Sequence, residues 1–375
     1  MLEKANVLLN DAAIQVFEWF RKKGFRTCIL KGQGNALMYP NLYSRTPGDI
    51  DVWIDASRER IMEYAQKKFE LGDDIRLQHL ETSLNGVPVE LHFFPCSMNN
   101  PIYHARLQKW FKRNADLQCS NVVGLPDGAG DIAIPTSPFN VVYQLCHLYH
   151  HFFDEGIGMR QIIDYYVVMN DFWKVKESFS QPSRPSLPKE GSTAFPKPLS
   201  PQGTGDVTAP SRCSEPLRSK DGGPSKVSPD CAGCDRRGVS GDIASDASVS
   251  SAFTTDSSAS TALVVVQREL KYLGLWKFAG AVMYVLKEVL GLSEDKMIVP
   301  MDEKRGKLLL AEILDGGNFG RHFTKYAGFT HQSMGKKYFL KIWRNMHFVR
   351  YYPAEALCEP LFRTWHFFWR LKYKK

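Results

Sequence analysis

The stretch TPGDIDVWID, residues 46–55, places two aspartates inside a run of Ile, Val and Trp. Branched and aromatic residues favour a β-strand, and side chains two residues apart on a strand point to the same face. The pattern therefore predicts a strand with Ile50 and Val52 facing the core and Asp49 and Asp51 on the opposite face. Two carboxylates this close repel each other, and an apolar setting makes their charges costly unless a cation accompanies them.

A D-x-D strand has two interpretations. It can be an edge strand with two solvated acids, or it can belong to a cation site, where oxygen ligands favour a hard ion such as Mg²⁺. The segment VPVELHFF, 87–94, places Glu90 in an apolar hairpin strand with His92 on the same face. Three acids on neighbouring strands can hold two metal ions about 3.5–4 Å apart, a pair that promotes phosphoryl displacement. Glu90 thus favours the cation site, and His92 is either a structural histidine or part of that site.

The residues before the aspartates suit an anionic ligand. ILKGQGNALMY, 29–39, has the pattern of a strand, a glycine-bearing turn and a short helix. The N–H groups of such a helix N-terminus point at an anion, and a triphosphate fits that description. Lys31 and Arg45 lie close to the aspartates in sequence, so we expect them to neutralise phosphate oxygens.

Two further patterns in the first part of the chain predict secondary structure. NDAAIQVFEWFRKKG, 10–24, has helical spacing of its apolar residues, and Asn10 or Asp11 is a candidate N-cap. IRLQHLETSLNGVPVELHFFP, 75–95, alternates polar and apolar residues on both sides of Asn85-Gly86, the strongest hairpin signal in the chain.

Composition divides the 375 residues into four parts. Residues 1–125 mix strand and helix patterns, 126–176 are helical, and 262–375 are helical with a basic, aromatic tail. Residues 177–261 are rich in Ser, Pro and Gly and have hardly any aromatic or branched apolar residues. Such a segment cannot bury enough apolar surface to offset the entropy of ordering, so we expect a disordered insertion there. The helical parts on either side are expected to form one domain.

Charge is concentrated at the C-terminal end. The chain has a formal net charge of +8, and residues 321–375 contain 12 Lys and Arg against 2 Asp and Glu, interleaved with Trp, Phe and Tyr. The simplest interpretation is a set of helices with core aromatics and solvated basic faces. The functional alternative is contact with a polyanion, either RNA or an anionic membrane surface.

The cysteines and the apolar runs bear on the compartment. Cys231 and Cys234 form a C-x-x-C with no second pair at zinc-ribbon spacing. The other six cysteines are dispersed among apolar residues, as is typical of reduced, buried thiols. No apolar run approaches the roughly 18 residues of a transmembrane helix, and the N-terminal residues lack the features of a secretory signal. We therefore expect a cytoplasmic protein.

Several of these motifs together resemble a known family. LKGQGNALMYPNLYSRTPGDIDVWI, 30–54, followed by VELHFF, 89–94, is similar to the nucleotidyltransferase superfamily typified by DNA polymerase beta. Within it, the chain resembles an uncharacterised bacterial nucleotidyltransferase family with a Lys-Gly start, an Arg before Gly-Asp-Ile-Asp and a Glu-x-His strand. The His-containing segment 145–169 and LLLAEILDGGNFG, 308–320, also look like later segments of that family, so the resemblance covers most of the chain outside the insertion.

The resemblance implies an α+β fold: a small mixed β-sheet nucleotidyltransferase core flanked by helices, plus an α-helical domain. It also implies two Mg²⁺ ions held by Asp49 and Asp51 together with the nucleotide phosphates. Glu90 would complete the metal site or accept the proton of the acceptor hydroxyl. The chain departs from the wider superfamily at Lys31-Gly32, where Gly-Ser or Gly-Gly is usual, and in its longer gap to Asp49.

Residue type and position in the motifs select a set of nucleotide-binding candidates. His147 could contact nucleotide or acceptor, although the i, i+4 pair of His147 and His151 could also hold a metal ion. Arg160 and Asp164 are either a helix salt bridge at i, i+4 or residues of the cleft. The full set is Lys31, Gly32, Arg45, His92, His147, Arg160 and Asp164.

The leading hypothesis is a Mg²⁺-dependent enzyme that transfers a nucleoside monophosphate from a nucleoside triphosphate to an acceptor, with release of pyrophosphate. The acceptor can be a small molecule, an RNA or a protein, and toxin-like modification of a tRNA or a protein side chain belongs to the same chemistry. The alternative is a catalytically inactive module on the same fold that binds a nucleotide, RNA or a membrane.

Overall fold

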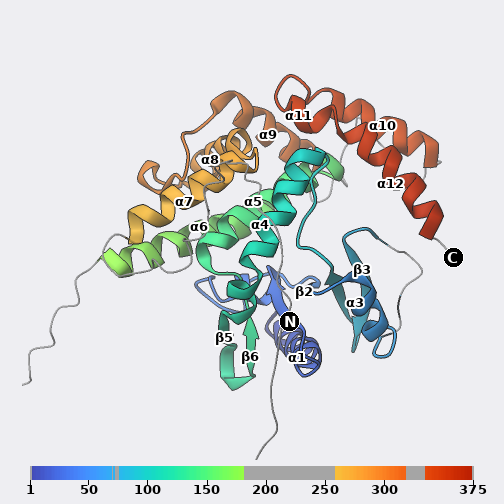
Figure 1. Ribbon diagram of the computed structural model, residues 1–375. Coiled ribbons are helices and arrows are strands. Elements are labelled where there is room, and N and C mark those ends of the chain that lie inside the picture. Colours follow the sequence, from blue (N-terminus) through green and yellow to red (C-terminus); the bar gives the residue numbers. More distant parts are fainter. Residues whose placement is uncertain (1, 70, 72–75, 181–257, 318–333, 374–375) are drawn as a thin grey trace, which may run out of the picture. The chain divides into compact units, whose positions relative to one another are not determined.

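The computed structural model describes residues 2–69, 71, 76–180, 258–317 and 334–373 (Figure 1). Most of the predicted insertion at 177–261, with its C-x-x-C, lies outside these residues, as do the family-like residues 318–320. The helices on either side continue a few residues into the predicted insertion, to Ser180 and from Ser258. The boundaries of the four predicted parts stay predictions.

The central sheet has four strands in the order β1-β2-β4-β3. β1 (Arg26–Leu30) runs antiparallel to β2 (Ile50–Asp55), and β2 runs parallel to β4 (Val87–His92). β3 (His79–Leu84) pairs antiparallel with β4 across the predicted Asn85-Gly86 turn. Both turn residues have positive φ, 52° and 80°, as a two-residue type I′ hairpin requires. The sheet is therefore mixed, as the resemblance implies.

Helices make up most of the rest of the described chain, which confirms the α+β class. The helices are α1 (Leu2–Arg21), α2 (Gly32–Ala36), α3 (Arg58–Ala65), α4 (Pro101–Ser120), α5 (Ser137–Asp154), α6 (Met159–Ser180), α7 (Ser258–Tyr272), α8 (Trp276–Leu290), α9 (Glu303–Gly316), α10 (Met334–Met346), α11 (Pro353–Ala356) and α12 (Glu359–Tyr373). Strands β5 (Val122–Gly124) and β6 (Asp131–Ala133) form a separate two-stranded sheet.

Two local expectations are wrong, and one helix was not predicted. α1 begins at Leu2, so both Asn10 and Asp11 lie inside the helix and neither is an N-cap. The side-chain oxygen of buried Asn10 accepts a hydrogen bond from Gln33. Residues 131–133 form β6 instead of starting the helical part, and α4 has no counterpart among the predicted elements. Tertiary contacts determine the secondary structure of these segments, because the same apolar residues suit either a strand or a helix once they are buried.

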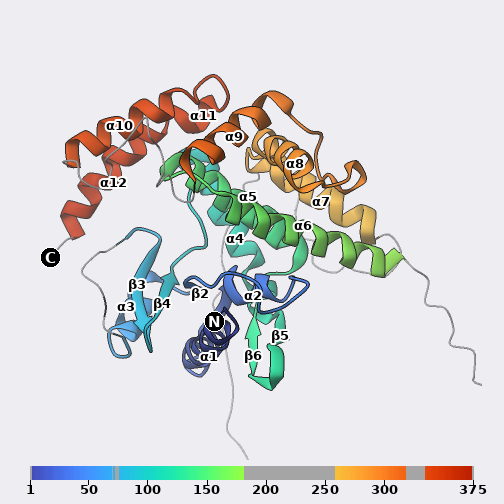
Figure 2. The same ribbon diagram turned by 180° about the vertical axis from the view of Figure 1, so that it is seen from behind.

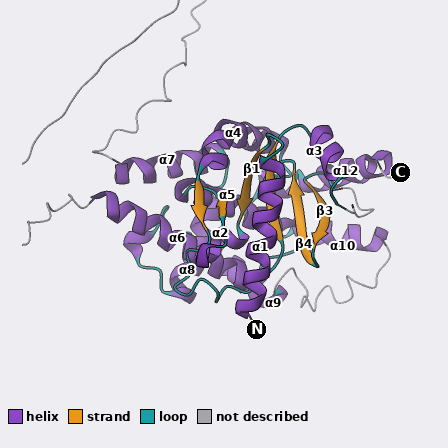
Figure 3. Cartoon of the chain, turned by 90° about the horizontal axis from the view of Figure 1, so that it is seen from below, coloured by secondary structure: helices purple, strands orange, loops and turns teal. Residues whose placement is uncertain are grey.

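The two faces of the sheet belong to different cores. On one face Ile29, Val52 and Leu91 are buried with Phe17 of α1 and Ile61 of α3 (Figure 3). The other face is covered at one end by aromatic rings. There Trp53 of β2 stacks on Phe139 of α5 at a centroid distance of 6.2 Å, and Phe139 stacks on Trp110 of α4 at 4.3 Å. Asp51 lies on this second face, two residues before Trp53.

The helices before and after the insertion pack together. α5 and α6 contact α7 and α8 (Figure 2). In the sequence, the undescribed residues 181–257 separate the two pairs of helices. Phe152 of α5, Phe278 of α8 and Phe348 share one core, with ring centroids 4.5–5.8 Å from Phe152. The helical region is thus assembled from two distant parts of the sequence.

Five of the cysteines lie in the described residues, and all five are free thiols. Cys28, Cys96 and Cys146 are buried as expected, whereas Cys119 and Cys358 are partly exposed. Within the same residues, no helix combines the length and the apolar character that a membrane crossing requires.

Gly306 allows the close approach of α9 to α8. A Cβ built at position 306 would lie 2.3 Å from Cβ of Tyr284, far inside van der Waals contact. We expect Gly306→Ala to destabilise the protein by about 2–3 kcal/mol, as overpacking does, although Ala is the better helix former. Urea denaturation measures this change. Leu314→Ala, at a residue of the same helix that is 72% exposed, is the control and should have little effect. Equal stability of Gly306→Ala and the wild type would contradict the packing argument.

Candidate active site

The three predicted acids converge at one end of β2. Asp51 lies opposite Glu90 in the parallel β2–β4 register, so both side chains leave the sheet on the same face. Asp49 precedes the first residue of β2. One carboxylate oxygen from each of the three residues lies within 4.8 Å of the other two. The grouping predicted from sequence is therefore present.

The three acids differ in solvent exposure, and the more exposed ones are more accessible to a ligand. Asp51 is buried at 2% exposure, Glu90 is partly exposed and Asp49 is exposed. The charge of Asp51 is the main reason that the pKa of Asp49 is raised, and partial burial adds to it. The raised pKa is the electrostatic signature of carboxylates held closer than their charges favour, which a divalent cation would relieve.

Two basic side chains contact Asp51. Lys31 Nζ lies 3.1 Å from Asp51 Oδ2, and His92 Nε2 lies 3.0 Å from Oδ1. Burial alone would raise the pKa of Asp51, but the charge of Lys31 and the hydrogen bond from His92 outweigh it and lower the pKa well below its ordinary value. Asp51 is thus ionised and engaged through both oxygens.

His92 bridges two of the carboxylates. Its Nε2 also lies 3.2 Å from Glu90 Oε2. Burial alone would lower the pKa of His92, but hydrogen bonds to Asp51 and Glu90 raise it to about 9. The pKa of Glu90 is lowered because the hydrogen bond from His92 outweighs the effect of burial. At neutral pH the three acids, Lys31 and protonated His92 together carry a formal net charge of −1.

Lys31 reaches the cluster from a strained backbone. It precedes α2 with φ 47° and ψ −121°, a conformation that glycine adopts freely and other residues rarely. A residue held there costs about 1–3 kcal/mol, which the surrounding structure must compensate. Gly32 follows with φ 34°, and a Cβ there would lie 3.7 Å from the backbone oxygen of Asp49. α2 has five residues, so triphosphate binding at its N-terminus stays a prediction that its dipole supports only weakly.

Lys31, which contacts Asp51, also contacts His147 of α5. Its Nε2 is 2.8 Å from Lys31 Nζ and 3.2 Å from His151 Nε2. Burial, and then the charge of Lys31, lowers the pKa of His147 well below its ordinary value. The neutral ring therefore accepts a hydrogen bond from the Lys31 ammonium group.

Arg45 and Asp164 form a buried ion pair with each other. Arg45 Nε lies 3.0 Å from Asp164 Oδ1 and a terminal guanidinium nitrogen 2.9 Å from Oδ2, and the Tyr39 hydroxyl also donates to Oδ1 at 2.6 Å. This arrangement joins the loop before β2 to α6. The predicted helix salt bridge of Asp164 with Arg160 is wrong, because Arg45 takes that place. A role of Arg45 and Asp164 in binding nucleotide stays a prediction, and the ion pair occupies two of the five N–H donors of Arg45.

Arg160, at the start of α6, faces the loop that carries Asp49. It donates to the backbone oxygen of Thr46 at 3.0 Å, and a Cβ at Gly48 would lie 3.0 Å from its guanidinium. Among the described residues, Arg160 has no carboxylate partner within salt-bridge distance. It is thus a positive charge beside the cluster that is available to an anionic ligand.

His79 is a neighbour of the cluster that the sequence reasoning missed. It lies opposite His92 in the β3–β4 register, with ring centroids 4.9 Å apart, and its Nδ1 is 3.5 Å from Glu90 Oε2. Counting residue pairs outward from the predicted Asn85-Gly86 turn would have placed His79 beside His92.

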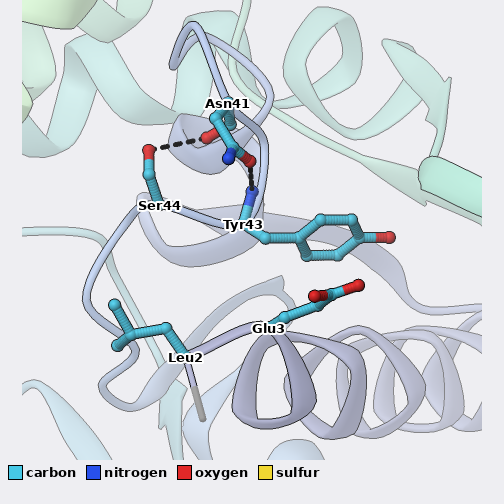
Figure 4. Close-up of a pocket in the computed structure, with 5 residues that line it drawn as sticks. All are labelled: Leu2, Glu3, Asn41, Tyr43 and Ser44. Carbon is cyan, nitrogen blue, oxygen red and sulfur yellow. Dashed lines mark hydrogen bonds between the residues drawn. The ribbon is translucent and has the colours of Figure 1, made fainter.

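A second feature, a surface hollow of about 700 Å³, lies between the start of α1 and the loop after α2 (Figure 4). In this loop Ser44 Oγ donates to the backbone oxygen of Asn41, whose side chain accepts from the Tyr43 N–H. None of the clustered acids lines the hollow, so it does not mark the candidate site. Its lining residues are Leu2, Glu3, Asn41, Tyr43 and Ser44.

The C-terminal helices expose apolar side chains beside basic ones. On α10, Phe339 and Trp343 are 70% and 54% exposed, and on α12 Leu361 and Phe368 are 72% and 63% exposed. The expectation of core aromatics is therefore wrong for Phe339, Trp343 and Phe368. Contact of this surface with a polyanion stays a prediction.

The sequence comparison agrees with the site geometry. The sequence model of a family described as uncharacterised nucleotidyltransferase matches residues 1–178. The match includes the sheet, the three acids, Lys31 and the histidines of α5, and it confirms the resemblance that the motifs indicate. The family-like segment 308–320 lies outside the matched residues. A search of curated proteins finds no match to this chain.

The strain at Lys31 predicts an unusual order of stabilities. Lys31→Gly and Lys31→Ala remove the same ammonium group, but only glycine relaxes at φ 47°. We expect Lys31→Gly to be more stable than Lys31→Ala by about 1 kcal/mol in urea denaturation. Lys109, exposed on α4, is the matched control, and there the order should reverse because glycine disfavours a helix. The same order at both sites would argue against backbone strain.

The His92 bridge predicts a pH dependence of stability in protein freed of metal with EDTA. Because the folded pKa of about 9 exceeds the ordinary 6.5, the stabilisation is fully present below pH 6.5 and is lost as the pH rises through 9. The stability advantage over His92→Gln should shrink by up to about 3 kcal/mol across that window, at about 1.4 kcal/mol per pKa unit. Denaturation at several pH values measures it, with the exposed His347→Gln as control. A constant advantage from pH 6 to 9.5 would refute a protonated bridge.

Proposed function

We propose, on the premise that residues 1–178 are those of a nucleotidyltransferase, that this protein transfers a nucleoside monophosphate from a nucleoside triphosphate to an acceptor. An acceptor oxygen would attack the α-phosphorus, the bond to the β-phosphate oxygen would break, and pyrophosphate would leave. The observation that carries the proposal is the convergence of Asp49, Asp51 and Glu90, each with an oxygen within 4.8 Å of the others.

The acids fit a divalent cation, for which Mg²⁺ is the simplest choice. They offer oxygen ligands only, and the raised pKa of Asp49 reflects a charge conflict that such an ion relieves. Asp49, Asp51 and Glu90 would hold it, and when bound it would stabilise negative charge on the transferring phosphoryl group. Asp51 would exchange a contact with Lys31 or His92 for this ligand, since both of its oxygens have basic partners.

The chain's own side chains have separate roles in this proposal. Glu90 is ionised and partly exposed, so it can accept the proton of an acceptor hydroxyl. Lys31 contacts Asp51, and Arg160 contacts the loop before Asp49, so both can supply positive charge for the phosphates. His147 keeps Lys31 oriented through the hydrogen bond to its Nζ.

Two observations support a cytoplasmic setting. The described cysteines are free thiols, as expected in a reducing compartment, and the described residues contain no helix suited to cross a membrane. We infer cytoplasmic action on a nucleoside triphosphate, with a small molecule, an RNA or a protein as the acceptor.

Asp51→Asn provides the direct test. Incubation with labelled nucleoside triphosphates and Mg²⁺ should release pyrophosphate or label an acceptor or the protein itself, and the variant should fall to background because it loses the central carboxylate. Asp55→Asn is the matched control, because Asp55 lies on the same strand, four residues away, and pairs with Arg26. Normal turnover in Asp51→Asn would end the proposal.

Calorimetry separates the enzyme from an inactive binding module on the same fold. An enzyme should bind nucleoside triphosphate more tightly with Mg²⁺ than without it, because the metal-free cluster carries a formal net charge of −1. Binding that is independent of metal, together with no turnover of any nucleotide, would identify the inactive module instead.

A further inference from the structure

His79 poses a problem that the proposed reaction does not explain. It is 8% exposed, and both of its ring nitrogens are buried without a hydrogen-bond partner. Burial, and then the charge of His92, lowers its pKa to about 4, so the ring is neutral near pH 7. A neutral imidazole has one donor and one acceptor, and leaving both unsatisfied costs folding free energy. Buried polar groups usually have a hydrogen-bond partner, and an ion is one of the groups that can satisfy a nitrogen left without one.

The neighbours of His79 are metal-ligating groups. Its Nδ1 lies 3.5 Å from Glu90 Oε2, and His92 Nε2 lies 3.2 Å from that same oxygen. One atom from each of the three residues lies within 4.8 Å of the other two. The β3–β4 hairpin fixes this grouping, because His79 and His92 are paired directly across it.

These separations suit ligands that share an ion. Zinc binds imidazole nitrogen at about 2.0–2.1 Å and carboxylate oxygen at about 2.0–2.2 Å, so two ligands of a tetrahedral site are about 3.3–3.5 Å apart. The two N···O separations around Glu90 Oε2 have this size. The 3.5 Å separation of His79 Nδ1 from Glu90 Oε2 is too long for a hydrogen bond, whereas His92 Nε2 is bonded to the same oxygen at 3.2 Å.

We propose that His79, His92 and Glu90 form a second cation site, selective for a transition-metal ion of the Zn²⁺ class. Imidazole nitrogen suits Zn²⁺ and related ions, whereas Mg²⁺ prefers oxygen. The second site therefore differs in chemistry from the oxygen-only set of Asp49, Asp51 and Glu90, and Glu90 belongs to both. Three protein ligands leave a fourth position for water or a substrate oxygen.

Gln78 is placed to support the metal-bound form of His92. Its side chain lies 3.4 Å from His92 Nδ1 and also contacts Ser97 Oγ at 3.3 Å. A metal ion on Nε2 displaces the proton there and leaves the ring proton on Nδ1, from which the oxygen of a rotated Gln78 amide can accept a hydrogen bond. A second hydrogen-bond partner of this kind is usual for histidines that bind metal.

Co²⁺ titration of the full chain tests the site, since Co²⁺ replaces Zn²⁺ and its visible spectrum reports nitrogen ligands. EDTA-stripped wild type should bind Co²⁺ with a visible band, and His79→Leu should weaken binding at least about 10–100-fold, the loss seen even for supporting residues. Asp49→Asn removes an acid outside the site and should retain the band. His347→Leu, at an exposed histidine, should behave as wild type.

Thermal denaturation with and without Zn²⁺ is a second measurement of metal binding that does not depend on the Co²⁺ spectrum. His79→Leu removes two unsatisfied nitrogens, so its metal-free Tm should equal or exceed that of wild type, while Zn²⁺ should raise the Tm of wild type only. If His79→Leu does not fold, His79→Gln replaces it in both measurements. Equal Co²⁺ affinity, or an equal Tm rise with Zn²⁺, in wild type and the His79 variants overturns the site.

The proposal of this site does not rest on the proposed reaction, and the experiments test the two separately. Co²⁺ and Zn²⁺ binding are measured without nucleotide, so a protein that transfers no nucleotide can still hold the ion. Conversely, nucleotidyl transfer that is unchanged in His79→Leu while Co²⁺ binding is lost assigns the two sites different roles.

Discussion

The mutual repulsion of Asp49, Asp51 and Glu90 is the constraint on which the rest of the site depends. The parallel register of β2 and β4 sets Asp51 beside Glu90, and the residue before β2 adds Asp49. Three negative charges within 4.8 Å in a partly buried setting are unfavourable without compensation. Lys31 and His92 supply the compensating positive charge, and each does so in an energetically unfavourable state. Lys31 adopts a left-handed backbone, and His92 keeps a proton that burial disfavours.

Helices that lie far from the sheet in sequence hold Lys31 and the neighbouring loop in place. His147 of α5 accepts from Lys31, and the amides of Asn35 and Gln144 bond each other at 2.8 and 3.1 Å, which fastens α2 to α5. The Arg45–Asp164 ion pair fastens the loop before β2 to α6. The sheet with its acids and the first helices of the helical region are therefore one structural unit, and the family match covers the same residues, 1–178.

Glu90 connects two ligand sets of different chemistry. With Asp49 and Asp51 it forms an oxygen-only set open to solvent on the Asp49 side, and with His79 and His92 it forms a set that contains nitrogen and is largely buried. An ion bound in either set would neutralise part of the charge on Glu90 and would therefore change how strongly the other set binds an ion. This coupling follows from the hairpin, because β4 alternates and so presents Glu90 and His92 on the face that also carries His79.

Local pattern alone determined the elements that carry the site. Alternation predicted β2 and β4, and Asn85-Gly86 predicted their hairpin partner, because side-chain period and turn geometry are properties of neighbouring residues. The convergence of Asp49, Asp51 and Glu90 follows once those strands are adjacent. By contrast, the sequence did not predict which side chains the charged residues contact. Arg45 rather than Arg160 binds Asp164, and His79 joins the cluster, because these pairings depend on strand order and on which helix covers which face. Only the tertiary structure decides such contacts, since they join residues as much as 119 positions apart.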